Sequence, residues 1–172
     1  MQMLTSVDAI CTNVAGCAVC VSTADCVPIL LYDMRHQAVA AIHSGWRGTV
    51  KRILTHSLRR MNELYGTEGK DLLAAIGPSI SLESFEVGDE VYEAFDEARF
   101  DMRQIATFDD EARKYHIDLW KANTMQLDTF GVPNNQIQVS GICTYRSHED
   151  FFSARRLGKD SGRILSGIMI NK

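Results

Sequence analysis

The chain has 172 residues, of which 45% are hydrophobic and 23% charged, and its formal net charge is -4. This length suits one domain with a core of its own, and the composition is typical of a folded, water-soluble protein. The acidic balance argues against a nucleic-acid partner, because Lys and Arg supply most of that affinity, and no apolar stretch approaches the roughly 20 residues that span a membrane.

The N-terminus and the cysteines indicate where the protein works. Residues 1–8 contain neither a basic region followed by a long apolar run nor a small-residue cleavage site, so we predict no secretion signal and expect a cytoplasmic protein. Five cysteines form an odd set that is a poor disulfide framework, so reduced thiols are expected. We expect core packing, without chemistry, for four of them: Cys11, Cys17, Cys20 and Cys143.

The first third of the chain predicts strands followed by a helix. Apolar segments rich in Val, Ile, Ala and Cys predict strands at residues 9–12, 18–23, 28–33 and 38–43. Apolar residues then recur at helical spacing from Val50 to Tyr65, with charged residues on the other side and Gly66 after the last turn. This pattern predicts one amphipathic helix that covers a sheet.

The rest of the chain predicts alternating strands and helices. Strands are expected at residues 72–76, 137–143 and 164–170, and helices at 87–95 and from Asp118 to Phe130. Residues 100–114 are polar and weakly periodic, and we interpret them as a connection or surface insertion. No linker divides the chain. The mixture favours an α+β fold with mixed β-sheets over a doubly wound parallel sheet.

Two segments place reactive side chains at the ends of predicted strands. Cys26 lies at the end of an apolar strand, immediately before a Val-Pro pair, and the proline removes a ladder donor there. His43 opens the segment His-Ser-Gly-Trp-Arg-Gly, which leads into the predicted helix. If the two strands are neighbours, a thiol and an imidazole converge, and they could form either a zinc site or a Cys-His nucleophile pair. The spacing alone does not choose between them.

An arginine-bearing segment near the C-terminus suits an anion. Residues 151–156 read Phe-Phe-Ser-Ala-Arg-Arg, and Gly158 and the Ser-Gly-Arg of residues 161–163 follow. A guanidinium group can donate two parallel hydrogen bonds to an oxyanion, so we expect a phosphate site here. The alternative is a set of solvated arginines near a chain end. His148 is a weaker candidate for the same site.

Several of these segments, taken together and in order, resemble one family. They are Thr-Ala-Asp-Cys-Val-Pro at residues 23–28, His-Ser-Gly-Trp-Arg-Gly-Thr at 43–49, Ala-Ile-Gly-Pro-Ser-Ile at 75–80, Asp-Leu-Trp-Lys-Ala-Asn at 118–123 and the Arg-Arg segment at 151–156. The chain is similar to the YfiH, or laccase-domain, family, once described as multicopper polyphenol oxidases and now regarded as purine nucleoside phosphorylases with adenosine deaminase activity. The resemblance implies an α/β/β/α arrangement of mixed β-sheets, similar to the catalytic domain of the cytotoxic necrotising factors.

The resemblance also implies a zinc ion held by one cysteine and two histidines. The cysteine corresponds to Cys26 and one histidine to His43, whereas the second family histidine belongs to a segment upstream of the part that this chain matches. We therefore interpret residues 1–172 as a single catalytic domain that lacks the N-terminal portion of the family, and such a truncated chain is expected to hold zinc poorly and to have little activity.

The implied reaction is the attack of phosphate on the ribose of adenosine, inosine or guanosine. We expect Arg47, Arg155 and Arg156 to hold the phosphate, because a fixed dianion lowers the barrier through orientation and electrostatics. Cys26 and His43 would bind Zn²⁺, which could also support deamination of adenosine. Asp25 is a candidate proton carrier, and Glu86 is a second one.

Three alternatives remain at this stage. Cys26 could be a nucleophile activated by His43 without a metal, as in a Cys-His hydrolase. A copper oxidoreductase agrees with the older family description, but five scattered histidines are few for multicopper chemistry. The chain could also be a non-catalytic binding module. The sequence leaves the oligomeric state open.

Overall fold

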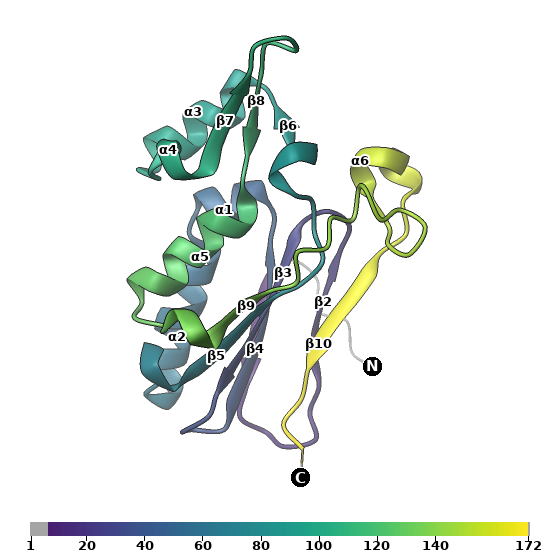
Figure 1. Cartoon of the computed structure of the whole chain (residues 1–172). Helices are drawn as coiled ribbons and strands as arrows, with labels where there is room; N and C mark the ends of the chain where they lie inside the picture. The colour runs from purple at the N-terminus through teal and green to yellow at the C-terminus, as the bar shows by residue number, and fades with distance from the viewer. Residues whose placement is uncertain (1–6, 172) are drawn as a thin grey trace.

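A mixed five-stranded sheet forms the centre of the molecule, seen in Figure 1. The computed structural model describes residues 7–171, so most of the N-terminal segment examined for a secretion signal lies outside the described part. The sheet has the order β1-β4-β3-β5-β9, and only the β5–β9 pair is parallel. Its strands are β1 (Ala9–Thr12), β3 (Val27–Asp33), β4 (Ala38–Ser44), β5 (Leu72–Ile76) and β9 (Ile137–Val139).

A second sheet covers the face of the first that is turned away from the helices. It consists of β2 (Val19–Thr23) paired antiparallel with β10 (Ile164–Ile168). Side chains alternate along β4: Ala40 and Ile42 belong to the core under the helices, whereas Val39 and Ala41 pack against β2 and the C-terminal strand. Helices, five-stranded sheet and two-stranded sheet are thus successive layers in Figure 1, which confirms the α+β fold with mixed sheets.

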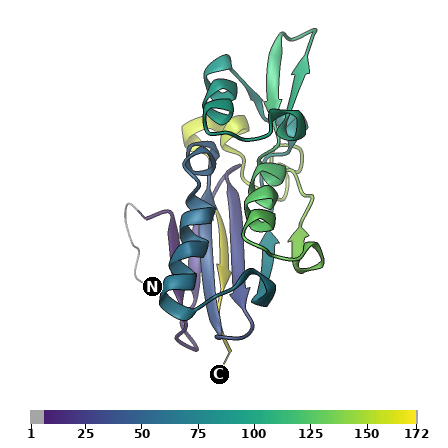
Figure 2. The same cartoon turned by 90° about the vertical axis from the view of Figure 1, so that its left-hand side faces the viewer.

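Three helices lie on the outer face of the five-stranded sheet, as Figure 2 shows: α1 (Trp46–Val50), α2 (Ile53–Tyr65) and α5 (Leu119–Thr129). The helix predicted from Val50 to Tyr65 is present as α2 but begins later, at Ile53, because Arg52 has a left-handed backbone (φ 60°) that separates α1 from α2. Its guanidinium donates to the carbonyl of Ala98 (2.8 Å) and lies 3.5 Å from the ring centroid of Phe100. These tertiary contacts stabilise a break that local periodicity does not reveal.

Residues 86–117 form a separate small layer at the top of Figure 1. It contains a three-stranded sheet of β6 (Glu86–Val87), β8 (Lys114–Ile117) and β7 (Ala106–Asp109), together with α3 (Asp89–Glu97) and α4 (Met102–Ile105). Of the two interpretations of residues 100–114, a mere connection is wrong, because these residues carry α4, β7 and the start of β8, whereas a surface insertion agrees with their exposure. Tyr115 of β8 stacks on Tyr92 of α3 (4.0 Å between ring centroids), and its ring is tilted against that of Phe108 on β7 (4.8 Å).

The C-terminal part returns to the end of the sheets where Cys26 lies. The strand predicted at residues 137–143 ends early, at Val139, and Cys143 then makes an isolated bridge to Ser79. A short helix, α6 (Ala154–Leu157), precedes β10. Single 3-10 turns occur at Gly69–Asp71, Leu82–Ser84, Asn134–Gln136 and Gly158–Asp160. None of the helices between residues 7 and 171 has the length and apolar character that crossing a membrane requires.

Candidate active site

Cys26 and His43 converge on Gly45, as their positions in neighbouring strands predict. Strands β3 and β4 pair antiparallel with Pro28 opposite His43, so the start of β3 meets the end of β4. A Cβ atom built on Gly45 would lie 2.9 Å from Cys26 Sγ and 3.8 Å from His43 Nε2. The thiol and the imidazole therefore face the same small space above Gly45, which only a residue without a side chain leaves open.

A buried polar network fixes the junction between β4 and α1. The hydroxyls of Ser44 and Thr49 lie 2.9 Å apart, and Ser44 Oγ donates to Asn123 Oδ1 (3.0 Å). Asn123 in turn donates to the carbonyl of Leu119 (2.8 Å) within α5. Such networks hold their members rigidly when all partners are satisfied. The bend that brings Gly45 against the thiol is therefore anchored to the helix layer.

His43 has a different environment at each ring nitrogen. Nδ1 lies 3.3 Å from Asp8 Oδ1, and the backbone N–H of His43 donates to the carbonyl of Asp8 (2.7 Å). Nε2 is buried and has no hydrogen-bond partner among residues 7–171. Sequence analysis did not select Asp8. The signal was its position just before β1, because the β1–β4 register continues from Ala9 opposite Ile42 to place Asp8 beside His43.

The surroundings of Cys26 disfavour its thiolate in the metal-free chain. Burial raises the pKa of the Cys26 thiol, and the negative charges of Asp25 and Asp8 raise this pKa further, whereas Arg163 acts in the opposite direction. Arg163 directly precedes β10, whose first residue pairs with Thr23, so this segment lies at the end of β2 that leads to Cys26. A proton therefore has to leave before this sulfur can act as a ligand or nucleophile.

The carboxylate of Asp25 holds three chain segments together. It accepts hydrogen bonds from Thr144 Oγ1 (2.6 Å), Ser153 Oγ (3.0 Å) and the backbone N–H of Arg155 (2.6 Å), and it is buried. Its backbone is left-handed (φ 73°), and its carbonyl accepts from the N–H of Ile80 (3.0 Å). Asp25 thus attaches the loop after β9 and the start of α6 to the segment that carries Cys26.

The three arginines predicted to bind phosphate are all exposed, and each rests on an aromatic ring. Arg47 lies over Trp46 with 4.2 Å to the ring centroid. Arg155 Nη1 donates to the carbonyl of Glu86 (2.9 Å), and Arg156 Nη2 donates to the carbonyl of Tyr145 (3.0 Å). The structure brings the backbone of Arg155 to Asp25 and places Arg47 just after Gly45, so both segments border the Cys26–His43 space.

The donor set fits part of a zinc site. A cysteine sulfur and an imidazole nitrogen are preferred zinc ligands, and His43 Nε2 is a buried nitrogen that lacks a partner in the described chain. Between residues 7 and 171, however, no three His, Cys, Asp or Glu side chains are placed to hold a metal ion together. His148 lies exposed in the loop before α6. Cys26 and His43 can therefore supply two ligands.

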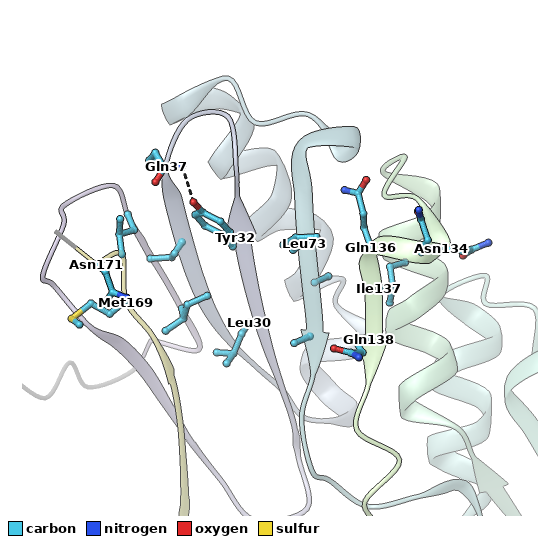
Figure 3. A pocket seen from close by; sticks show the side chains of 16 residues that line it. Leu30, Tyr32, Gln37, Leu73, Asn134, Gln136, Ile137, Gln138, Met169 and Asn171 are labelled. Atoms are coloured by element: carbon cyan, nitrogen blue, oxygen red, sulfur yellow. Dashed lines mark hydrogen bonds between the residues drawn. The ribbon is translucent and has the colours of Figure 1, made fainter.

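A hollow lies elsewhere, on the face of β3 and β5 shown in Figure 3. Its volume is about 800 Å³, and its labelled lining includes Leu30, Tyr32 and Leu73 on the sheet and Met169 from the C-terminal segment. No thiol, imidazole or carboxylate is among the residues that line it. We place the candidate active site at Cys26 and His43, because the hollow lacks groups for acid-base or metal chemistry.

The expectation of core packing is wrong for two of the remaining cysteines. Cys17 and Cys20 are exposed, because it is Val19 and Val21 that point into the core between the sheets, while Cys11 is half-buried. Cys143 is buried, as expected, and its sulfur accepts a hydrogen bond from the backbone N–H of Ser81 (3.4 Å).

Known proteins resemble this chain in sequence over nearly its whole length. It is 59% identical over 171 residues to a purine nucleoside phosphorylase of Bacteroides thetaiotaomicron, which covers 99% of this chain and 63% of that protein. It is 46% identical over 165 residues to adenosine deaminase RL5 of an unknown prokaryotic organism (96% and 63% covered), and 36% identical over 163 residues to purine nucleoside phosphorylase YfiH of Escherichia coli (95% and 63%). The chain thus spans about 63% of the length of these relatives.

Solved structures and a family description agree with these relatives. The crystal structure of YlmD from Geobacillus stearothermophilus matches with a TM-score of 0.89 at 32% identity, covering 97% of this chain and 62% of that one. The YfiH structure from Bacillus licheniformis matches with a TM-score of 0.88 at 30% identity (95% and 61% covered). Residues 1–171 match the family described as multi-copper polyphenol oxidoreductase laccase. The predicted resemblance is thereby confirmed, and this chain belongs to that family, together with the YfiH-type proteins that it resembles.

Proposed function

We propose that this chain carries the Cys–His site of a purine nucleoside phosphorylase, which converts adenosine, inosine or guanosine and phosphate into free purine and ribose 1-phosphate. The observation that carries the proposal is the convergence of Cys26 Sγ and His43 Nε2 above Gly45, bordered by the Arg47 and Arg155 segments. The names of the phosphorylase relatives support the same reaction class.

In this reaction a phosphate oxygen forms a bond to C1′ of the ribose while the bond from C1′ to the purine nitrogen breaks. The electron pair leaves with the purine, which takes up a proton, and positive charge develops on the sugar. Arg47, Arg155 and Arg156 would hold the phosphate in line, because a guanidinium group on an aromatic ring is already oriented before the anion arrives. These exposed donors come from two different elements, α1 and α6.

The structure suits Asp25 better to positioning than to proton transfer. A carboxylate that accepts three hydrogen bonds has its acceptor capacity largely used within the protein. We therefore propose that Asp25 places the Arg155 segment beside Cys26. The side chain of Glu86, which is exposed at the start of β6, remains the candidate proton carrier.

We further propose that Cys26 and His43 take part in holding zinc and that the protein also deaminates adenosine. When bound, zinc acts as a Lewis acid that lowers the pKa of water to near 7. The relative named adenosine deaminase supports this second activity. Copper, which the family description names, has less support, because multicopper sites draw on many histidines and this chain has five scattered ones.

Two further alternatives receive less support from the geometry. A cysteine nucleophile works when its pKa is lowered, whereas burial and two neighbouring acids raise the pKa of Cys26. A ligand role agrees better with this environment, because a metal ion supplies the positive charge that a thiolate needs there. A non-catalytic binding module would not require an unpartnered, buried imidazole nitrogen next to a thiol.

A cysteine substitution with a matched control tests the proposal. In the protein at its native length, we expect Cys26→Ser to lower phosphate-dependent release of hypoxanthine from inosine by more than about 100-fold, because serine is a poor zinc ligand. Cys17→Ser, at an exposed position that precedes β2, should leave the rate unchanged. Equal rates in the two variants would remove Cys26 from the active site, and absence of turnover in the unsubstituted protein would contradict the proposed function.

A further inference from the structure

The two nitrogens of His43 face opposite kinds of neighbour. Nδ1 lies 3.3 Å from a carboxylate oxygen of Asp8, at the outer side of the strand pair. Nε2 points inward, is buried without a hydrogen-bond partner in residues 7–171, and shares the space above Gly45 with Cys26 Sγ. An imidazole that faces a carboxylate with one nitrogen and has no partner at the other is poised to use its second nitrogen.

The chemistry of the pair decides which nitrogen carries the proton. An ionised carboxylate offers only acceptor oxygens, so the nitrogen beside it has to carry the hydrogen. A neutral imidazole has a single N–H group, and a proton on Nδ1 leaves the lone pair on Nε2. That lone pair is directed toward the site that Cys26 lines, and a nitrogen of this kind can bind a metal ion or accept a proton.

The contact between Asp8 and His43 has a backbone part and a side-chain part that can be separated. The backbone N–H of His43 donates to the carbonyl of Asp8 (2.7 Å), so the main chain aligns the two residues whatever side chain residue 8 carries. The Asp8 side chain is 65% exposed, and its packing contribution is accordingly small. The function of this carboxylate is therefore electrostatic, and its substitution should leave the strand pair intact.

We propose that Asp8 is a positioning residue that fixes the tautomer and ring orientation of His43, so that Nε2 presents its lone pair to the space shared with Cys26. This inference rests on the proposed function, which gives the oriented Nε2 its use. The tautomer of His43 itself is a property of the metal-free chain. The carboxylate acts on the imidazole alone, and it touches neither nucleoside nor phosphate.

Heteronuclear NMR of the imidazole nitrogens in the metal-free chain tests the tautomer directly, at about pH 8, where an ordinary histidine is neutral. We expect the Nδ1–H tautomer for His43, and a shift toward the Nε2–H tautomer in Asp8→Leu. Asp8→Asn should keep the Nδ1–H form, because its amide oxygen still accepts. His116, whose Nδ1 lies 3.1 Å from the carbonyl of Leu82, is an internal reference for that form. An unchanged His43 tautomer in Asp8→Leu would overturn the inference.

Zinc affinity of the protein at its native length, measured by competition with a chromophoric chelator, is the second test. Loss of such an outer partner weakens metal binding by about 10- to 100-fold, and we expect this range for Asp8→Leu and a smaller loss for Asp8→Asn. Asp110→Leu, at an exposed turn of the β7–β8 hairpin, is the matched control and should bind zinc as the unsubstituted chain does. Equal affinities in Asp8→Leu and Asp110→Leu would contradict the inference. Neither the NMR measurement nor the zinc measurement needs turnover. A protein with the expected tautomer but without phosphorolysis would therefore contradict the proposed function and leave this inference intact.

Discussion

Substitution of Gly45 should disturb the candidate site without destabilising the fold. A methyl group at this position would lie 2.9 Å from Cys26 Sγ, closer than real contacts allow, while the Gly45 backbone (φ -71°, ψ 169°) accommodates alanine without strain. We expect Gly45→Ala to displace the thiol and to weaken zinc binding by about tenfold or more, with a melting temperature close to that of the unsubstituted chain.

The matched control for this substitution is Gly48→Ala, one helical turn further on. Its added methyl group would meet the side chain of Ile53 at 3.3 Å and would not touch Cys26. Zinc binding should therefore persist in Gly48→Ala. If Gly45→Ala bound zinc as tightly as Gly48→Ala does, the space above Gly45 would not be the metal site.

The sequence predicted the pair of residues in the candidate site but not its supports. Cys26 and His43 could be placed together because Cys26 directly precedes β3, His43 lies near the end of β4, and the two consecutive strands pair antiparallel. The partners of Asp25 could not be found in this way, because Thr144 and Ser153 are 119 and 128 residues away along the sequence. Asp8 is hard to identify from the sequence, because an aspartate before a strand is common. Only the β1–β4 register shows that it lies beside His43.

At the scale of elements, the attachment of α6 and the loop after β9 depends on one buried carboxylate. In Asp25→Asn, one carboxylate oxygen becomes an amide NH₂ that cannot accept from Ser153 or from the backbone of Arg155. We expect a loss of about 1 to 3 kcal/mol in the free energy of unfolding and faster amide hydrogen exchange in residues 143–157.

Asp109→Asn is the control for that prediction. The carboxylate of Asp109 also accepts two backbone N–H groups, from Glu111 and Ala112, but it is exposed in the β7–β8 hairpin. Its loss should cost much less, and exchange in residues 143–157 should not change. Equal destabilisation by the two substitutions would mean that Asp25 does not have the structural role assigned to it.

The turn between β3 and β4 makes stability depend on pH through Asp33. Burial alone would raise the pKa of this carboxyl, but the nearby Thr67 hydroxyl and the hydrogen bonds from the backbone N–H and the ring of His36 outweigh it, and the pKa lies below its ordinary value. The folded-state pKa is thus lower than the unfolded one, so the stabilisation is present above the ordinary carboxyl pKa of about 4 and is lost as the pH falls through the folded value. In urea unfolding, the stability difference between the unsubstituted chain and Asp33→Asn should shrink toward acid. A difference that stayed constant from neutral to acid pH would contradict this.

The β7–β8 hairpin shows which elements a periodic pattern does not reveal. Its strands, Ala-Thr-Phe-Asp and Lys-Tyr-His-Ile, do alternate apolar and polar residues, but each pattern covers only four residues, the shortest length over which alternation indicates a strand. Tyr115 stacks on Tyr92 of α3 and is tilted against Phe108, its cross-strand partner, and the contact with α3 is not encoded in the local spacing of the hairpin. By contrast, the capping residue Asp118 and the stop at Gly66 were correctly predicted, because both signals are local.

For the whole molecule, the layers could be predicted more easily than the pairing of the strands. The sequence indicates strands on both sides of residue 26, but β2 pairs with β10 from the far end of the chain and not with β3, its neighbour in sequence. The two-stranded sheet also covers only part of the five-stranded one, and the hollow of Figure 3 opens over β3 and β5. Pairings of this kind are set by burial across the whole fold, which local propensity does not contain.

How much zinc the 172-residue chain retains depends on the whole molecule, because it depends on how many ligands the chain brings together. A catalytic zinc site uses about three protein ligands, whereas in the described part of this chain only Cys26 and His43 converge, and the chain spans about 63% of the length of its relatives. Because affinity comes from simultaneous coordination, we expect the 172-residue chain to fold yet to lose its zinc on dialysis. The Bacteroides thetaiotaomicron relative at full length, treated in parallel, should keep it. Metal analysis after dialysis decides the matter. One zinc per chain that survives dialysis would mean that a further group, such as His148 or a residue of a second copy, completes the site in this chain, and the assignment of only two ligands would then be wrong.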